Sequence, residues 1–130
     1  MSNLPQGADL LAIARDTLLS ELRPLLDEHG RYTIAMIANA MAIARREAEA
    51  GEAPALAALA RLDALHAIAY RELRGEALRE ALHSHDQQLA RDIRAGRYDA
   101  DDGRRRALLE HLRESVAAKL RISNPKALES

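Results

Sequence analysis

Hydrophobic residues recur along this chain at intervals of three and four, which is the spacing of one helix face. Glycine and proline divide the chain into stretches rich in Ala, Leu, Arg and Glu, which are strong helix formers. No alternating β-branched run of strand length occurs. The pattern predicts an all-α, single-domain bundle of five helices within residues 1–130, over 8–28, 32–50, 54–73, 76–94 and 105–121.

The first predicted helix contains Pro24 inside its apolar pattern. Proline lacks an N–H and disfavours helical backbone at the residue before it, so we expect a kink near this position. His29 and Gly30 are expected to close the segment.

The second predicted helix is apolar on almost every side. One stripe consists of Ile34, Ile37, Met41 and Ala44, and a second consists of Tyr32, Met36, Ala40 and Ile43. Such a helix belongs in the middle of a fold or in an interface. We therefore expect this helix to be central.

The remaining helices carry histidines on their apolar faces. In the third, His66 lies between the leucines and Tyr70, and in the fourth, His85 lies between Leu82 and Leu89. Asp101 or Asp102 is placed to cap the fifth helix, which ends before Asn124-Pro125.

Composition and charge exclude several classes of protein. The 130 residues include no Trp, Phe or Cys and only three Tyr. The chain has 19 basic and 20 acidic residues. Nucleic-acid binders usually show a basic excess and stacking aromatics, so we expect no nucleic-acid partner. Without cysteine there is no disulfide, thiolate metal site or cysteine nucleophile. Few rings also disfavour pockets for flat cofactors, and we expect no cofactor.

The N-terminal residues show neither the basic region nor the continuous apolar region of a secretory signal. No stretch approaches the 18 or more apolar residues of a membrane span. We therefore expect a cytoplasmic protein without a membrane partner.

The histidine patterns give weak metal signals. His83 and His85 lie on opposite sides of a helix, so they cannot grip one ion. The spacings Asp63/His66 and Glu80/His83 occur in di-metal bundles, but Glu80 and His83 are expected to face solvent. The sequence predicts no metal site and no catalytic residues. It favours His66 and His85 as hydrogen-bonded core residues over ligand-binding ones.

Asn39 stands out as a polar residue within the apolar second helix. Asparagine is a poor helix former, and a buried amide must find a hydrogen-bond partner. A bond to a neighbouring helix terminus or backbone carbonyl is favoured, and a ligand contact in a cleft is the alternative. Asn39, Tyr32, His66 and His85 are thus the candidate polar residues for a structural or ligand-binding role.

Three stretches resemble a known family. Ala8-Asp9-Leu10-Leu11 leads to Leu22-Arg23-Pro24-Leu25, residues 34–47 read IAMIANAMAIARRE, and residues 108–128 read LLEHLRESVAAKLRISNPKAL. They resemble the DUF6285 family, small bacterial helical proteins of unknown function. Residues 54–74 match this family least, and the resemblance assigns no catalytic residue.

The resemblance implies a metabolic context. Members of this family tend to be encoded beside a phosphotransferase-like kinase and an acyl-CoA dehydrogenase-like enzyme. This implies an accessory role in acyl-CoA or other small-molecule metabolism, with either enzyme as a possible partner.

We therefore expect a non-enzymatic accessory or interaction protein that forms a homo-oligomer, with a twofold dimer as the default. The alternative is a small helical enzyme or ligand-binding module with a pocket near Asn39, Tyr32, His66 or His85.

Overall fold

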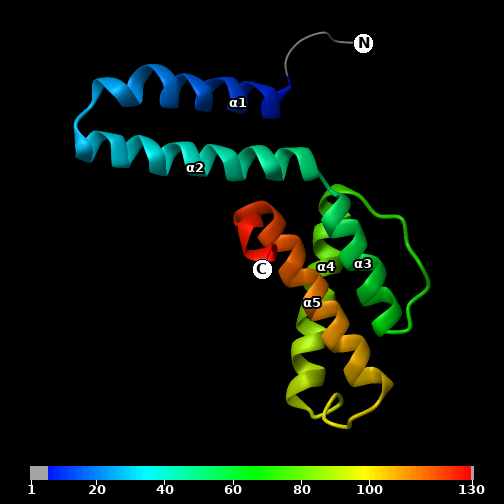
Figure 1. Cartoon of the computed structure of the whole chain (residues 1–130). Coiled ribbons are helices and arrows are strands. Elements are labelled where there is room, and N and C mark those ends of the chain that lie inside the picture. Colours follow the sequence, from blue (N-terminus) through cyan, green and yellow to red (C-terminus); the bar gives the residue numbers. More distant parts are fainter. Residues whose placement is uncertain (1–5, 130) are drawn as a thin grey trace. The chain divides into compact units, whose positions relative to one another are not determined.

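Five α-helices form most of the molecule. The computed structural model describes residues 6–129, and Figure 1 shows these helices in order along the chain. They are α1 (Gly7–Thr17), α2 (Glu28–Ala50), α3 (Ala53–Leu65), α4 (Gly75–Arg94) and α5 (Gly103–Ser123). No strand occurs in the described range, so the predicted all-α class and its five helices are confirmed. None of the helices within residues 6–129 has both the length and the apolar character needed to cross a membrane.

The first helical segment is broken before Pro24, as predicted. After α1 the chain passes through a π-helical turn, Leu18–Leu22, and a 3-10 turn, Arg23–Leu25. Proline cannot donate the hydrogen bond that a continuous α-helix requires. The backbone therefore changes from the α-helical to the π-helical pattern before Pro24 and to the 3-10 pattern around it. The kink is confirmed, although the helical segment ends at Leu25 and not at Glu28.

The start of α2 differs from the prediction. Asp27 has an extended backbone, and its carboxylate accepts a hydrogen bond of 2.8 Å from the N–H of Gly30. This is an N-cap, so His29 and Gly30 belong to the first turn of α2 and do not close the preceding helix. A Cβ at Gly30 would lie 2.9 Å from the Cβ of Leu26, which explains the glycine at this close approach. The prediction was wrong because Gly30 is needed for the close approach to Leu26 and does not end a helix.

The end of α3 corrects a second prediction. The helix stops at Leu65 and not at residue 73, and Ala67 takes a left-handed backbone with φ of 56°. The N–H of Ile68 donates to the carbonyl of Asp63 at 2.7 Å, and the N–H of Ala67 donates to the carbonyl of Ala64 at 3.2 Å. These two bonds form a Schellman motif, which usually has glycine at the left-handed position. Because alanine occupies that position, the end of α3 could not be predicted from the sequence.

The start of α5 agrees with the prediction. The carboxylate of Asp102 accepts hydrogen bonds from the N–H groups of Arg104 at 3.0 Å and Arg105 at 3.2 Å. Asp102 is therefore the capping residue of the two that were proposed.

The chain divides into two compact units, which are described separately. Unit 1 comprises residues up to Gly51 and residues from Arg121 onward, and unit 2 comprises Glu52–Leu120. The single-domain organisation stays a prediction.

Unit 1 is built on α1 and α2, which run side by side in opposite directions (Figure 1). Arg15 Nε donates to the carbonyl oxygen of Ala38 at 3.1 Å, and Arg46 Nε donates to the carbonyl oxygen of Ile122 at 2.7 Å. In α2 the buried residues are Ile34 and Ala38, whereas we expected apolar contacts around the whole helix.

Unit 2 holds most of the buried leucines. α3 packs against α4, and Leu62, Leu89 and Leu108 from α3, α4 and α5 contact one another. Leu59, Leu62 and Leu78 are each 1% exposed. Partly buried side chains of Leu65, Leu82 and Tyr98 pack against this cluster. The core therefore lies beside the end of α3, where polar side chains also meet.

Candidate functional site

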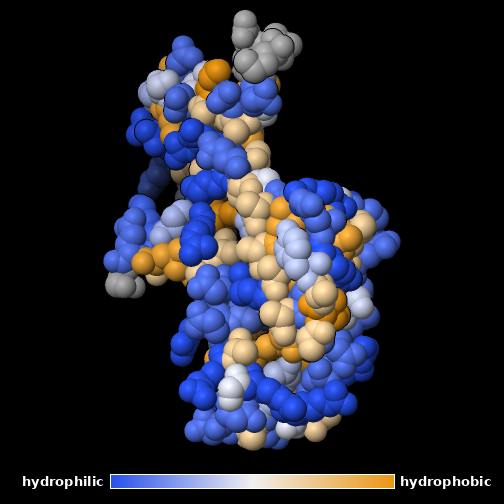
Figure 2. Space-filling view, turned by 90° about the vertical axis from the view of Figure 1, so that its right-hand side faces the viewer, coloured by the Kyte–Doolittle hydropathy of each residue, from blue (hydrophilic) through white to orange (hydrophobic). Residues whose placement is uncertain are grey.

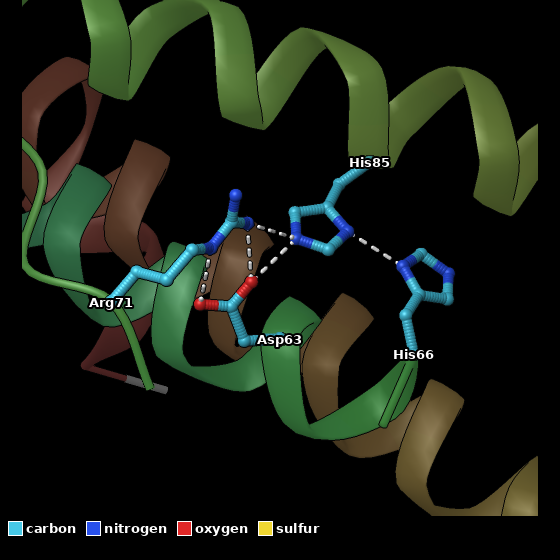
Figure 3. Close-up of polar contacts among 4 residues, drawn as sticks. All are labelled: Asp63, His66, Arg71 and His85. Carbon is cyan, nitrogen blue, oxygen red and sulfur yellow. Dashed lines mark hydrogen bonds and ion pairs between the residues drawn. The ribbon is translucent and has the colours of Figure 1, made fainter. Parts of the chain in front are cut away.

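Four polar side chains meet beside the core of unit 2, as Figure 3 shows: Asp63, His66, Arg71 and His85. Asp63 lies in the last turn of α3, and His66 is its C-terminal capping residue. His85 projects from α4, and Arg71 comes from the segment between these helices. Because Ala67 reverses the chain direction after α3, this segment carries Arg71 back to Asp63. We call these four residues the histidine cluster.

Asp63 anchors the histidine cluster. Its Oδ1 accepts a hydrogen bond of 2.6 Å from Arg71 NH2 and lies 2.7 Å from His85 Nε2. The residue is 2% exposed, so its charge depends on these partners. The Arg71 hydrogen bond lowers the pKa of Asp63 despite the opposing effect of burial, and the His85 hydrogen bond adds to the lowering. The carboxylate is therefore ionised at neutral pH.

The two histidines bond directly to each other. His66 Nδ1 and His85 Nδ1 are 2.6 Å apart, and the rings stack with centroids 4.8 Å apart and planes at 20°. His85 is 5% exposed. The favoured prediction, that both histidines are hydrogen-bonded residues beside the core, matches these contacts. Whether they also bind a ligand stays a prediction.

The hydrogen-bond network restricts which ring nitrogens can carry protons. An ionised carboxylate only accepts, so the 2.7 Å contact with Asp63 requires a proton on His85 Nε2. The 2.6 Å contact between the two Nδ1 atoms requires a proton on one of them, so one ring donates and the other accepts. Arg71 NH2 also approaches His85 Nε2 at 3.2 Å, but both atoms carry protons, so this contact is no hydrogen bond. We infer this assignment from the network.

His66 Nε2 is a buried polar atom that the network leaves over. It has no hydrogen-bond partner among the described residues, and the nearest carboxylate oxygen is Asp92 Oδ2 at 3.9 Å. The side chains of His66 and Asp92 are 10% and 9% exposed. Burial, reinforced by His85, lowers the pKa of His66, while Asp92 and Asp63 act in the opposite direction. His66 is therefore neutral at neutral pH.

Two cavities adjoin His66. One of about 340 Å³ is bounded by Arg71, Ser84 and His85, and another of about 460 Å³ is bounded by Asp92, Tyr98 and Arg104. Both also touch Gln88. The histidine cluster thus adjoins space that a small molecule can enter.

The cluster does not have the geometry of a metal centre. Residues 6–129 contain no group of three or more His, Cys, Asp or Glu side chains that could hold a metal ion. In the histidine cluster the two Nδ1 atoms face each other at 2.6 Å, so their lone pairs do not converge on a shared ion.

A third histidine is buried elsewhere in unit 2. His111 on α5 is 6% exposed, and its Nδ1 accepts a hydrogen bond of 3.1 Å from Arg61 Nε. Burial, followed by the charge of Arg61, lowers the pKa of His111. The sequence analysis did not select this residue, because one histidine among charged neighbours gives no pattern.

The structure brings together two of the four candidate residues. His66 and His85 contact each other in unit 2. Tyr32 and Asn39 lie on α2 in unit 1, and both are exposed. Asn39 therefore does not need a buried partner for its amide. A ligand site that includes Tyr32 and Asn39 stays a prediction.

The sequence analysis missed Arg71 and Asp92. It noticed Asp63 only as half of an Asp63/His66 metal spacing, although that spacing does place both residues on one side of α3. No local signal marks Arg71, because its position depends on the chain reversal at Ala67.

The fold and the histidine cluster define a small helical protein with a buried polar network beside its core. A family model described as a domain of unknown function, DUF6285, matches residues 24–127. The chain therefore belongs to this family, as its sequence resemblance indicated. No curated protein and no solved structure matches the chain.

Proposed function

We propose that this protein is a helical interaction protein that forms a homodimer through the second apolar stripe of α2. The observation that carries the proposal is the exposure of this stripe: Tyr32 is 65% exposed and Met36 is 55% exposed. Large apolar side chains at this level of exposure often mark a surface that binds another protein. Apolar residues also reach the surface elsewhere, as the orange atoms among the blue ones in Figure 2 show.

The geometry of α2 supports a separate role for this stripe. At 100° per residue, Tyr32, Met36 and Ile43 lie on the side opposite Ile34 and Ala38. Ile34 and Ala38 are the buried residues of α2. One apolar side of α2 is thus buried, and the N-terminal half of the other is exposed.

The charge pattern favours a second copy of the chain as the occupant. No charged residue occurs from Tyr32 to Ala44, although charged residues make up 30% of the chain. An uncharged stripe offers no electrostatic feature for a charged partner to recognise, whereas an identical stripe matches it in character. A twofold axis would place the stripe against itself, and Ala40 would permit close approach of the two helices.

Analytical ultracentrifugation at micromolar concentration tests the dimer. The protein should sediment at twice its chain mass of 14.3 kDa. Met36→Glu should give a monomer, because the twofold axis would bring two buried like charges together. Ala35→Glu, an exposed position on α2 outside the stripe, is the matched control and should remain dimeric. A monomeric wild-type protein would overturn the proposal.

The accessory role extends this proposal to a partner enzyme. The family resemblance implies a kinase-like or acyl-CoA dehydrogenase-like neighbour in a cytoplasmic pathway of small-molecule metabolism. Co-purification of the tagged chain with each neighbour tests this role. If neither enzyme forms a complex with the chain, the accessory role is excluded while the homodimer is unaffected.

A second candidate function is a ligand-binding module in unit 2. The observation that favours it is a cavity of about 460 Å³ that His66, Asp92 and Arg97 line together. A few polar and charged side chains that converge on one cavity are typical of a small-molecule site. NMR chemical shifts of the Gln88 side-chain amide during a fragment screen test this function. A screen without any saturable shift would exclude it.

A further inference from the structure

The helix α5 presents apolar side chains at the surface of unit 2. Leu109, Leu112 and Val116 are 42%, 41% and 56% exposed. The buried residues of this helix are Leu108 and His111. At 100° per residue, the three exposed side chains lie about 100° around the helix from the two buried ones. α5 therefore attaches to the core along one side and leaves a second apolar side exposed.

The spacing of these exposed residues is that of a seam between two helices. Leu109, Leu112 and Val116 follow one another at intervals of three and four, which are the a, d and a positions of a heptad. Side chains at such positions insert between the side chains of a facing helix. The surface is thus suited to a helix that lies along α5. We call these three residues the α5 stripe.

Arginines line one edge of the α5 stripe. In the same heptad register, Arg106 and Arg113 occupy the e positions, and both are exposed. Neither side chain has a hydrogen bond or an ion pair with another residue in the described part of the chain. Glu110 and Glu114 take the b and f positions, which lie further around the helix from the stripe. This edge therefore carries positive charge that the chain itself does not neutralise.

These charges restrict the kind of partner, because charges beside a helix seam determine which helices can pair. A second copy of α5 in a twofold arrangement would bring arginine against arginine. A membrane surface is also a poorer match. Helices that lie in a membrane interface present a large apolar side with aromatic residues, whereas the α5 stripe is one line of three aliphatic side chains. A facing helix with an apolar seam and acidic edges would match both the spacing and the charge.

We propose that the α5 stripe docks an acidic amphipathic helix of another protein, whose carboxylates pair with Arg106 and Arg113. The proposal goes beyond the homodimer. The α5 stripe lies in unit 2 and shares no residue with the second apolar stripe of α2, so the two proposals can fail separately.

Two synthetic helical peptides test the proposal. Both carry leucine at a and d, and one has glutamate at e and g where the other has lysine. In an NMR titration of the ¹⁵N-labelled protein, the acidic peptide should give saturable shifts at the amides of Leu109, Leu112 and Val116. The affinity for the acidic peptide should exceed that for the basic one by at least about tenfold, because each arginine changes from an attractive to a repulsive pair. This preference should shrink as salt is added.

Variants identify the contacts. Leu112→Asp should abolish binding, because it places a charge in the seam, and circular dichroism checks that the helices are retained. Arg113→Glu should weaken binding of the acidic peptide at least about fivefold and strengthen binding of the basic one. Arg94→Glu makes the same change of charge at an exposed position on α4 outside the stripe. This matched control should bind both peptides as the wild type does.

Three results would contradict the proposal. A lack of saturable shifts with the acidic peptide would show that the stripe does not accept such a helix. Equal affinity for the two peptides would show that Arg106 and Arg113 do not select the partner. Co-sedimentation with phosphatidylserine vesicles that Leu112→Asp abolishes, without binding of the acidic peptide, would assign the surface to a membrane instead. The sedimentation mass of the chain, which tests the homodimer, is measured without either peptide.

Discussion

The two units of this protein differ in whether they bury polar side chains. In unit 1, Leu25 on the exit from the first helical segment and Tyr32 on α2 are 76% and 65% exposed. In unit 2, Asp63 and His85 are 2% and 5% exposed, and each has a close hydrogen-bond partner. Unit 1 thus presents apolar surface, whereas unit 2 buries a polar network. The difference supports the proposals of association through unit 1 and of a ligand site in unit 2.

The largest expected effect comes from the leucine core of unit 2. Leu62→Ala should lower the free energy of unfolding by about 4 kcal/mol, because the fully buried side chain leaves a cavity among packed neighbours. Ile13→Ala in unit 1 removes a side chain that is 59% exposed. This variant should change the free energy of unfolding by less than about 0.5 kcal/mol. Urea denaturation followed by circular dichroism measures both variants. Equal losses at the two positions would remove the contrast between the units.

Breaking the anchor of the histidine cluster should cost somewhat less. Asp63→Ala leaves His85 and Arg71 without their shared acceptor and should lower the free energy of unfolding by about 3 kcal/mol. The value lies at the lower end for such pairs because the Arg71 side chain is 39% exposed and can reach water. Glu72→Ala is the control, since this side chain is 72% exposed and its contact with Arg74 is 3.5 Å long. Similar denaturation midpoints for the two variants would show that the cluster adds no stability.

The buried histidines should make the stability of the protein depend on pH. The pKa values of His66 and His111 lie below the ordinary value because burial disfavours the charged ring. The unfolded chain then binds protons at a higher pH than the folded one, so the free energy of unfolding falls as the pH drops through about 6.5. Above this range both states are neutral and the contribution is constant. Urea denaturation at pH 7.5, 6.5 and 5.5 measures the slope, which should flatten in a His66→Gln, His111→Gln double variant.

The smallest expected effect is a gain in stability at the end of α3. Ala67→Gly should raise the free energy of unfolding by about 1 kcal/mol, because glycine adopts a φ of 56° without the Cβ clash that alanine suffers. Thermal denaturation detects the change. Ala69→Gly in the following segment is the control and should give no gain, since its backbone does not have a positive φ. A loss of stability in Ala67→Gly would contradict the proposed strain.

Much of the local structure could be predicted from particular residues. Pro24 marked the break in the first segment, and the Asp101-Asp102 pair marked the start of α5. The intervals between leucines placed His66 and His85 on the faces that meet beside the core. These signals are local, because the missing N–H of proline and the short carboxylate of aspartate act on backbone within one turn.

The histidine cluster could be predicted only in part. The stripes suggested that His66 and His85 were hydrogen-bonded beside the core, but they did not identify Asp63 and Arg71 as partners. The Asp63–His85 pair joins residues 22 positions apart. Such pairing depends on how α3 and α4 pack, which no local spacing specifies.

The sequence by itself determined that this chain is all-α, where its first helix breaks and which of its faces are apolar, because helix period and backbone chemistry are read over a few residues. The tertiary structure alone decided that α3 ends at Leu65, that Arg71 returns to Asp63 and that His66 Nε2 is buried near Asp92. The physical reason is that Ala67 holds an unfavourable left-handed backbone. Contacts with the surrounding structure must support that conformation, so it cannot be predicted from an alanine in the sequence.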